Sequence, residues 1–533
     1  DNFNIDWRII PALRLQGRFS YTRQFDRRDL FKSPESLDYS TETDPKKKGS
    51  YYLVNSRSDR FDGNLTLAYN KTIDKHMLNV GVGSNIMQSE TEGESFTGVG
   101  FINPDMIFIG AANAFQENTS PQGTYDKSRL VGFFTNVNYG YGNRYFLDFS
   151  FRSDGSSKFG RNSRFAPFWS LGVAWNVHNE SFWHAHEKNA LKLRASVGST
   201  GTTNFSSTQA LTTYLYDFSR EYNGNFGVSL AGYGNSSLKW QTTLSYNVGV
   251  DFTFLHGLVV FNGDFYIKNT RSLLLPVTVA PSTGFIDYVE NIGKLRNTGV
   301  EARLRFNLIQ DAVKDLRWNV TLSAFHNRSK ITQLSNQLET INQYANDDRA
   351  NQGTVVYRQF EAGRSQTALM VVRSGGIDPA TGNEIYIKRN GEMTFEYNHN
   401  DKIECGDMKP KIEGNVNTNL NWKGFNLYML FKYQYGGKIY NATLASKVEG
   451  VNPLKNADKR VLYDRWKEPG DHAKFRRIDD TSAPYQTTRL VFDNNLLALQ
   501  SVSLSYELPR KISQKMYMER VKLLLSSTDL FRL

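Results

Sequence analysis

The residues of this sequence that could perform chemistry are few and poorly placed for it. His184, His186 and Glu187 lie together in WHAHEKN, but their spacing is not that of an HExxH zinc helix, and no second ligand set lies nearby. Cys405 is the single cysteine of the 533 residues, and the sequence places no base that would activate its thiol. Phosphate-loop and serine-nucleophile motifs are also missing. We therefore expect a protein that is not an enzyme and for which no metal or cofactor can be assigned.

Two turns rich in oxygen ligands leave calcium as an open alternative. Carboxylates and amides are the ligands that calcium takes, but neither turn follows the EF-hand loop. The turn GIDPATGNE holds Asp378, Asn383 and Glu384, and the turn NDKIECGD holds Asp401, Glu404 and Asp407. The other interpretation is that both are ordinary turns.

Aromatic residues in long polar segments are better candidates for binding a ligand. Sugars stack on aromatic faces and peptides offer backbone groups to the polar neighbours of such rings. The segments 200–238 and 330–410 supply the candidate substrate-binding residues Tyr214, Tyr216, Tyr222, Tyr357, Phe360 and Tyr386. The alternative is that these rings pack within their own loops or against another protein.

The elements that position these loops are strands with a two-residue period. In YFLDFSFR, residues 145–152, aromatic and aliphatic side chains alternate with polar ones, and residues 244–254 repeat the pattern. Segments of roughly ten such residues fit strands that cross a bilayer at a tilt. We expect lipid contact for Phe149, Phe151, Phe252, Phe254, Phe431 and Tyr433, and a polar lumen for Asp148, Arg152, Asp251 and Lys432.

About fifteen strands can be placed along the chain. They lie near residues 10–22, 59–70, 76–88, 129–141, 144–153, 165–177, 190–199, 239–255, 258–269, 298–309, 317–328, 411–421, 425–436, 499–508 and 520–531. Short connections such as YGNR and NWKG alternate with long ones such as 200–238 and 330–410. This predicts an all-β, antiparallel, up-and-down transmembrane barrel with short periplasmic turns at one rim and long extracellular loops at the other.

Bulk composition agrees with this fold class without proving it. The mean hydropathy of −0.51 excludes a helical membrane protein, and no apolar run is long enough for a membrane-spanning helix. The 28 Tyr and 35 Phe fit the aromatic girdles of a barrel, although a soluble β core predicts similar counts. The net charge of +11 suits contact with anionic lipid or solute, although solvated charge explains it equally well. Nothing indicates nucleic-acid binding.

The sequence resembles the SusC/RagA family of TonB-dependent outer-membrane transporters along nearly its whole length. The stretches that carry the resemblance include RSDGSSKFGRNSRFAPFWSLGVAWNVHNESFW (152–183), LKLRASVGSTG (191–201), STGFIDYVENIGKLRNTGVE (282–301), GDMKPKIEGNVNTNLNWKGFNLYMLFKYQYGGKIYN (406–441) and ADKRVLYDRWKEPGD (457–471). The resemblance implies that residues 1–533 are part of one barrel domain of about 22 strands. It also implies that the N-terminal plug, the first barrel strands and the last strand are absent from this chain. An odd count of fifteen strands agrees, because bacterial single-chain barrels have even numbers.

The resemblance also implies a function and partners. Members import oligosaccharides or oligopeptides across the outer membrane of Bacteroidota-like Gram-negative cells, with energy from TonB and a SusD-like surface lipoprotein as a lid. We expect the segment 437–498 to dock that lipoprotein through Tyr463, Arg465 and Trp466, unless Arg465 and Trp466 brace the loop internally. The alternative function is a non-transporting outer-membrane receptor or scaffold barrel.

Overall fold

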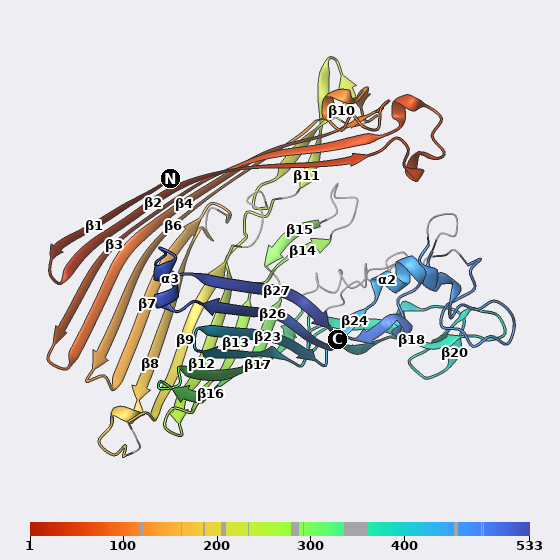
Figure 1. The fold of residues 1–533 in the computed structure, drawn as a ribbon. Helices are drawn as coiled ribbons and strands as arrows, with labels where there is room; N and C mark the ends of the chain where they lie inside the picture. The colour runs from red at the N-terminus through yellow and green to blue at the C-terminus, as the bar shows by residue number, and fades with distance from the viewer. Residues whose placement is uncertain are drawn as a thin grey trace.

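The computed structural model shows one large antiparallel sheet that curves into a barrel wall (Figure 1). It describes the whole chain except residues 118, 120, 161–162, 185–186, 204–208, 233, 279–286, 292, 335–360, 452–456, 481 and 483. Each long strand of the wall pairs with the next long strand along the chain, from β1 with β2 to β26 with β27. The up-and-down topology that the sequence predicted is therefore confirmed.

The wall contains seventeen strands within the described residues, one of which has only two residues. They are β1 (Asn2–Ile10), β2 (Leu13–Lys32), β3 (Ser50–Ile73), β4 (His76–Val99), β5 (Ala114–Phe115), β6 (Gln122–Tyr141), β7 (Tyr145–Ser156), β8 (Phe165–Asn176), β9 (Ala190–Thr202), β12 (Gln241–Phe254), β13 (Val259–Arg271), β16 (Lys294–Asp311), β17 (Leu316–Gln333), β22 (Ile412–Trp422), β23 (Phe425–Tyr435), β26 (Leu496–Glu507) and β27 (Lys522–Arg532).

The remaining elements belong to the connections. The small strands are β10 (Thr213–Tyr222), β11 (Asn225–Gly232), β14 (Leu274–Thr278), β15 (Asp287–Asn291), β18 (Ala368–Ile377), β19 (Glu384–Ile387), β20 (Met393–Thr394), β21 (Lys402–Asp407), β24 (Lys438–Tyr440) and β25 (Val491–Asp493). The helical turns are η1 (Leu37–Tyr39), η2 (Pro45–Lys47), η3 (Ile109–Ala111), η5 (Val177–Asn179), η7 (His399–Asp401), α2 (Ala442–Leu444), η8 (Ala445–Glu449), η9 (Lys459–Leu462), η10 (Thr488–Leu490) and α3 (Arg510–Lys515). In the described part of the chain, no helix has the length and hydropathy to cross a membrane.

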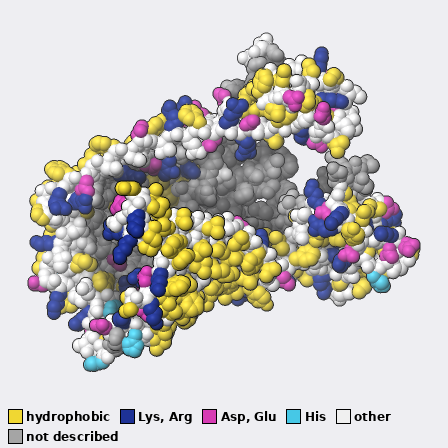
Figure 2. Space-filling model, in the orientation of Figure 1, with side chains coloured by type: hydrophobic (Ala, Val, Ile, Leu, Met, Phe, Trp, Pro, Cys, Tyr) yellow, Lys and Arg dark blue, Asp and Glu magenta, His cyan; other side chains and the backbone are white. Residues whose placement is uncertain are grey.

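Strand register gives the wall one apolar face and one polar face. Directly paired residues share a face, and one such row runs across nine neighbouring strands through Leu13, Tyr69, Val80, Val137, Phe149, Leu171, Val197, Tyr246 and Ile267. The next row along the strands lies on the opposite face and runs through Asn138, Asp148, Gly172, Ser196, Asn247 and Tyr266. Figure 2 shows that hydrophobic side chains cover the outside of the wall over β23, β26 and β27.

The predicted lipid-facing and lumen-facing residues fall on these two faces as expected. Phe431 pairs with Val416, which continues the apolar row through Leu322, Leu304 and Phe261 to Phe252. Lys432 pairs with Asn415, which continues the polar row through Ser323, Arg303 and Asn262 to Asp251. The alternation of apolar and polar residues in each strand is therefore aligned between neighbouring strands across the wall.

The two rims differ in the length of their connections, as the sequence predicted. Two-residue turns join β1 to β2, β3 to β4 and β22 to β23 at one rim, whereas the connections from β17 to β22 and from β23 to β26 lie at the other. We call these the turn rim and the loop rim. Antiparallel pairing of consecutive strands sends every second connection to the same rim. Because short and long connections alternate along the chain, the short ones lie at one rim and the long ones at the other.

Two differences from the predicted strands have clear physical causes. The predicted strand 10–22 corresponds to the start of β2, and β1 was not predicted, because the turn at Pro11 and Ala12 lacks the usual Gly, Asn or Asp signal. Strands β2, β3 and β4 also run far beyond their predicted ends toward the loop rim. There cross-strand ion pairs such as Arg23 with Asp59 (2.6 Å) and Lys127 with Glu90 (2.7 Å) interrupt the apolar rows, and Tyr51 and Leu53 of β3 are buried at the strand ends. An alternation search cannot detect a strand whose apolar residues are interrupted in this way.

The two faces can be tested with a pair of single cysteines. Val248 and Ser196 lie at the same height on neighbouring strands, since Val248 pairs with Ala195 and Asn247 pairs with Ser196. In a Cys405→Ser background, we expect a bimane label at Val248→Cys to be quenched several-fold by brominated lipid, because lipid tails contact the apolar face. The same label at Ser196→Cys should be quenched only by aqueous iodide. Equal quenching by brominated lipid at both sites would contradict the assignment.

Candidate functional site

The polar face of the wall carries a charged cluster at mid-height. Arg194 of β9 donates hydrogen bonds to Asp251 of β12 (2.9 Å) and to Asp264 of β13 (3.1 Å). Asn262 donates to the same Asp251 (2.8 Å). A cavity of about 210 Å³ beside this cluster is lined by Lys192, Arg194 and other polar residues. This part of the wall offers cations, carboxylates and amides to whatever occupies the lumen.

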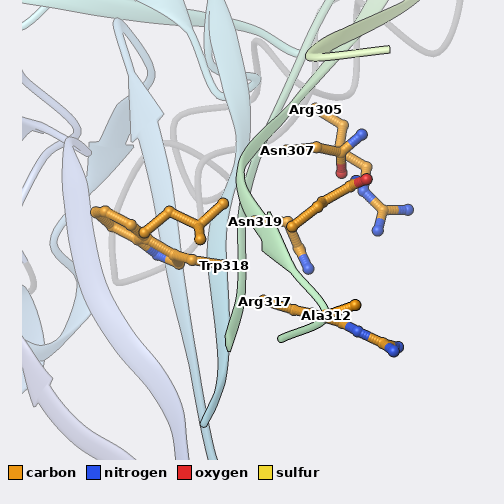
Figure 3. Close-up of a pocket in the computed structure, with 8 residues that line it drawn as sticks. Arg305, Asn307, Ala312, Arg317, Trp318 and Asn319 are labelled. Atoms are coloured by element: carbon orange, nitrogen blue, oxygen red, sulfur yellow. The ribbon is translucent and has the colours of Figure 1, made fainter. Parts of the chain in front are cut away.

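A second polar cavity lies on the same face close to the turn rim. It has a volume of about 430 Å³ and is lined by Arg305, Asn307, Arg317 and Asn319 of β16 and β17 (Figure 3). Figure 3 shows Trp318 on the other side of the strand from Arg317 and Asn319, as a two-residue period requires. In the described part of the chain, neither arginine is in a salt bridge, so both guanidinium groups are available to a solute or to a segment in the lumen.

The loop rim carries a unit with its own small sheets, which we call the loop unit. It combines the four-stranded sheet of β18 to β21 with the segment from β24 to β25. The Val372 amide donates to the Gln486 carbonyl (3.3 Å), and the Ser374 amide donates to the Thr488 hydroxyl (3.0 Å). Small apolar clusters fill the unit, one of them made of Val448, Val451, Val461 and Phe475.

A buried charge network holds the two parts of the loop unit together. Arg489 donates to Glu384 (3.0 Å) and to Glu449 (2.9 Å), whose side chains are 1% and 0% exposed. Arg476 donates to the same Glu449 (2.9 Å) and to Asp480 (2.6 Å). Although burial lowers the pKa of Arg489, the two carboxylates outweigh that effect and raise it above its ordinary value. The network is not visible in the sequence because Glu384 and Arg489 are 105 residues apart.

Of the predicted substrate-binding residues, two have described side chains. Tyr386 lies on β19 and is only 6% exposed. Its ring is edge-on to the rings of Tyr397 and Tyr485, with distances between ring centres of 5.5 Å and 6.1 Å. Burial raises the pKa of its hydroxyl. Tyr214 lies on β10 and is 64% exposed. The side chains of the other candidates, Tyr216, Tyr222, Tyr357 and Phe360, lie outside the described residues. Their role in binding stays a prediction.

The predicted partner-binding residues divide into buried and exposed ones. Arg465 is buried and donates to the carbonyls of Val461 (3.0 Å) and Arg476 (2.9 Å) and to that of Val448. Trp466 donates its indole N–H to the Pro379 carbonyl (2.9 Å). Both side chains therefore make contacts within the loop unit, Arg465 buried and Trp466 half-buried, and their role in partner binding stays a prediction. Tyr463 is 62% exposed and can contact a partner.

The two oxygen-rich turns use their carboxylates within the protein. Asp378 accepts hydrogen bonds from the Thr381 amide (3.1 Å) and hydroxyl (2.7 Å), and Glu404 pairs with Arg364 (2.6 Å). The described residues contain no group of three or more His, Cys, Asp or Glu side chains arranged to hold a metal ion. Asp378 and Glu404 are therefore engaged by partners within the protein.

Comparison with known proteins gives a family and a fold. A family model described as a TonB dependent receptor-like β-barrel matches residues 1–371. TonB-dependent receptor P3 of Formosa agariphila is 26% identical over 87% of this chain and 47% of that protein. TonB-dependent receptor SusC of Bacteroides thetaiotaomicron is 27% identical over 60% of this chain and 32% of that protein. The chain spans about half the length of the curated relatives that it matches.

Solved structures agree with the barrel fold. The structure of the RagAB peptide transporter aligns with 100% of this chain and 57% of its own, at 22% identity and a TM-score of 0.83. The RagAB peptide importer in the open-open state aligns at 21% identity and a TM-score of 0.81. Together with the sequence relatives, these matches confirm the resemblance to SusC and RagA.

The charge network can be tested with one internal and one surface substitution. Arg489→Met leaves Glu384 and Glu449 buried without their shared cation, and we expect it to destabilise the loop unit by roughly 3–5 kcal/mol. The measurement is hydrogen exchange of residues 368–387 and 484–490, which should become faster while the wall strands stay protected. Arg477→Ala removes an exposed pair with Asp479 and serves as the control, with an expected effect of about 1 kcal/mol or less. Equal effects of the two variants would show that the network does not hold the unit.

Proposed function

Because this chain belongs to the family of TonB-dependent receptor-like β-barrels, we propose that it forms the wall of an outer-membrane importer. The importer takes up oligosaccharides or oligopeptides with energy from TonB and with a SusD-like lipoprotein as its lid. The proposal depends on one observation: the polar face of the wall leads to the rim that carries the long loops. A solute captured among the loops meets a wall of amides, hydroxyls and charges along the whole depth of the barrel.

The composition of that wall supports a polar, oligomeric solute. Asn415, Asn417, Asn419 and Asn421 alternate along β22 on the polar face, and Asn426 of β23 donates to Asn419 (3.2 Å) and to Asn421 (2.5 Å). Amides both donate and accept hydrogen bonds, so they suit sugar hydroxyls and peptide groups equally. The relatives leave both classes open, since one solved neighbour is named a peptide transporter and one sequence relative is SusC.

An exposed apolar surface at the loop rim supports a protein lid. It lies on the two connections next to the ends of β2, β3 and β4, and consists of Leu37, Ile102, Met106, Ile107, Phe108 and Phe115, each at least 50% exposed. The same connections cover a buried apolar cluster of Phe101 with Tyr51 and Leu53 of β3, so this surface is preformed. We call it the tip surface. Exposed apolar surface above the membrane is typical of protein interfaces.

The proposed transport can be measured in cells that carry the full-length receptor. We expect uptake of one class of labelled oligomer, sugar or peptide, to be lost on deletion of the receptor and on deletion of TonB, because the barrel wall is passive. The control is the same strain complemented with the full-length receptor. Solute binding that persists without any TonB-dependent uptake would favour the alternative, a non-transporting receptor or scaffold barrel.

Docking of the lid can be tested with substitutions on the tip surface. We expect Ile102→Asp with Phe108→Asp to weaken co-purification of the lipoprotein by about tenfold or more, because buried apolar anchors dominate most interfaces. Leu462→Ser with Tyr463→Ser tests the loop unit in the same assay. Val313→Asp changes a residue that is 97% exposed at the turn rim and serves as the control. Unchanged affinity in both double variants would remove these surfaces as docking sites.

A further inference from the structure

The connection between β26 and β27 is unlike the short turns beside it. It runs from Leu508 to Val521 and contains the helix α3 (Arg510–Lys515). Between positions 509 and 519 it carries three cations, Arg510, Lys511 and Lys515, against one acid, Glu519. In the described part of the chain, none of the three cations is in a salt bridge. We call this segment the rim segment.

Side chains of the rim segment are sorted by type around the helix. Lys511 and Lys515 are four residues apart and so lie on one stripe. Ile512 and Met516 form a neighbouring stripe at the same spacing, and they are 47% and 49% exposed. Ser513 is 1% exposed and fixes the remaining side of the helix against the protein. The helix therefore exposes both a cationic and an apolar stripe to its surroundings, as helices that lie at a membrane surface do.

The backbone after α3 presents further apolar groups outward. Tyr517 adopts a φ of +57°, a left-handed conformation that is uncommon for any residue but glycine. Its side chain is fully exposed, and the neighbouring Met518 is 50% exposed. This conformation closes α3, because the Tyr517 amide donates to the Gln514 carbonyl (3.0 Å) and the Met518 amide donates to the Ser513 carbonyl (3.0 Å), as in a Schellman cap. The cap leaves the side chains of Tyr517 and Met518 pointing away from the helix.

The rim segment continues the apolar outer surface of the wall. Tyr506, two residues before Leu508, stacks on Phe425 with 4.2 Å between the ring centres. On the neighbouring strand β27 its partner in register is Leu523. On the adjacent turn, Trp422 is 50% exposed and Lys423 lies over its ring (5.8 Å). Figure 2 shows hydrophobic side chains next to Lys and Arg side chains at the α3 end of this wall. Aromatic rings with flanking cations are characteristic of the depth where lipid tails give way to headgroups.

We infer that the rim segment is a membrane-surface site that binds anionic phospholipid headgroups. Arg510, Lys511 and Lys515 pair with headgroup phosphates, while Ile512, Met516 and Tyr517 insert at the boundary of the acyl chains. Two observations identify lipid as the occupant: the segment is continuous with the lipid-facing rows of β26 and β27, and its charge is complementary to an anionic surface. The site is independent of the transported solute and of the lid.

The test compares two variants with equal loss of charge. Arg510→Gln, Lys511→Gln and Lys515→Gln are combined in one variant, and Lys46→Gln, Lys47→Gln and Lys48→Gln at the loop rim are combined in the other. Each full-length receptor is reconstituted in phosphatidylcholine vesicles that contain a minor fraction of phosphatidylglycerol. After extraction, the ratio of the two lipids retained by the protein is measured by mass spectrometry. Unchanged electrophoretic heat-modifiability confirms that both barrels are folded.

The expected result is a loss of phosphatidylglycerol enrichment only in the rim-segment variant, by about fivefold for each cation removed. A third variant, Ile512→Ser with Met516→Ser and Tyr517→Ser, should lose retention of both lipids at this site. Enrichment that is unchanged in the rim-segment variant would overturn the inference. So would an equal loss in the loop-rim variant, which would indicate a general effect of net charge.

Discussion

Satisfaction of backbone hydrogen bonds in lipid is the constraint on which the rest of this structure depends. The N–H and C=O groups of a strand cannot bond to water inside a bilayer, so each strand must be paired on both sides by other strands. The simplest solution is antiparallel pairing of consecutive strands, and the strands of the wall between β1 and β27 follow it; in the described residues β1 pairs with β2 alone and β27 with β26 alone. Every other regularity of the wall follows from this pairing.

The pairing explains both the two faces and the two rims. Because the pleat alternates side chains, a strand with lipid on one side and water on the other must alternate apolar and polar residues. Because consecutive strands run in opposite directions, connections alternate between the rims. Short turns gather at one rim, and the other rim is free to carry long insertions such as the loop unit.

Beyond the bilayer the constraint is relaxed, and the protein uses other means to hold its shape. Strands β2 to β4 continue with backbone pairing and surface ion pairs, and Tyr51 and Leu53 of β3 pack against Phe101 near their ends. The loop unit buries Glu384, Glu449 and Arg489 at low exposure. A buried ion pair adds little net stability but penalises any arrangement that leaves one partner alone. It therefore fixes how the two distant segments of the loop unit meet.

The sequence by itself determined the wall: its strand class, the faces of residues such as Phe149 and Asp148, and the alternation of turns and loops. These properties are local, because the two-residue alternation of a strand and the length of a turn can each be recognised within about ten residues. The tertiary structure alone decided which residues meet in the loops. It turned Arg465 and Trp466 inward, buried Tyr386, and joined Glu384 to Arg489 across 105 residues. Contacts of that separation depend on how a whole loop closes, and no local pattern of side chains records it.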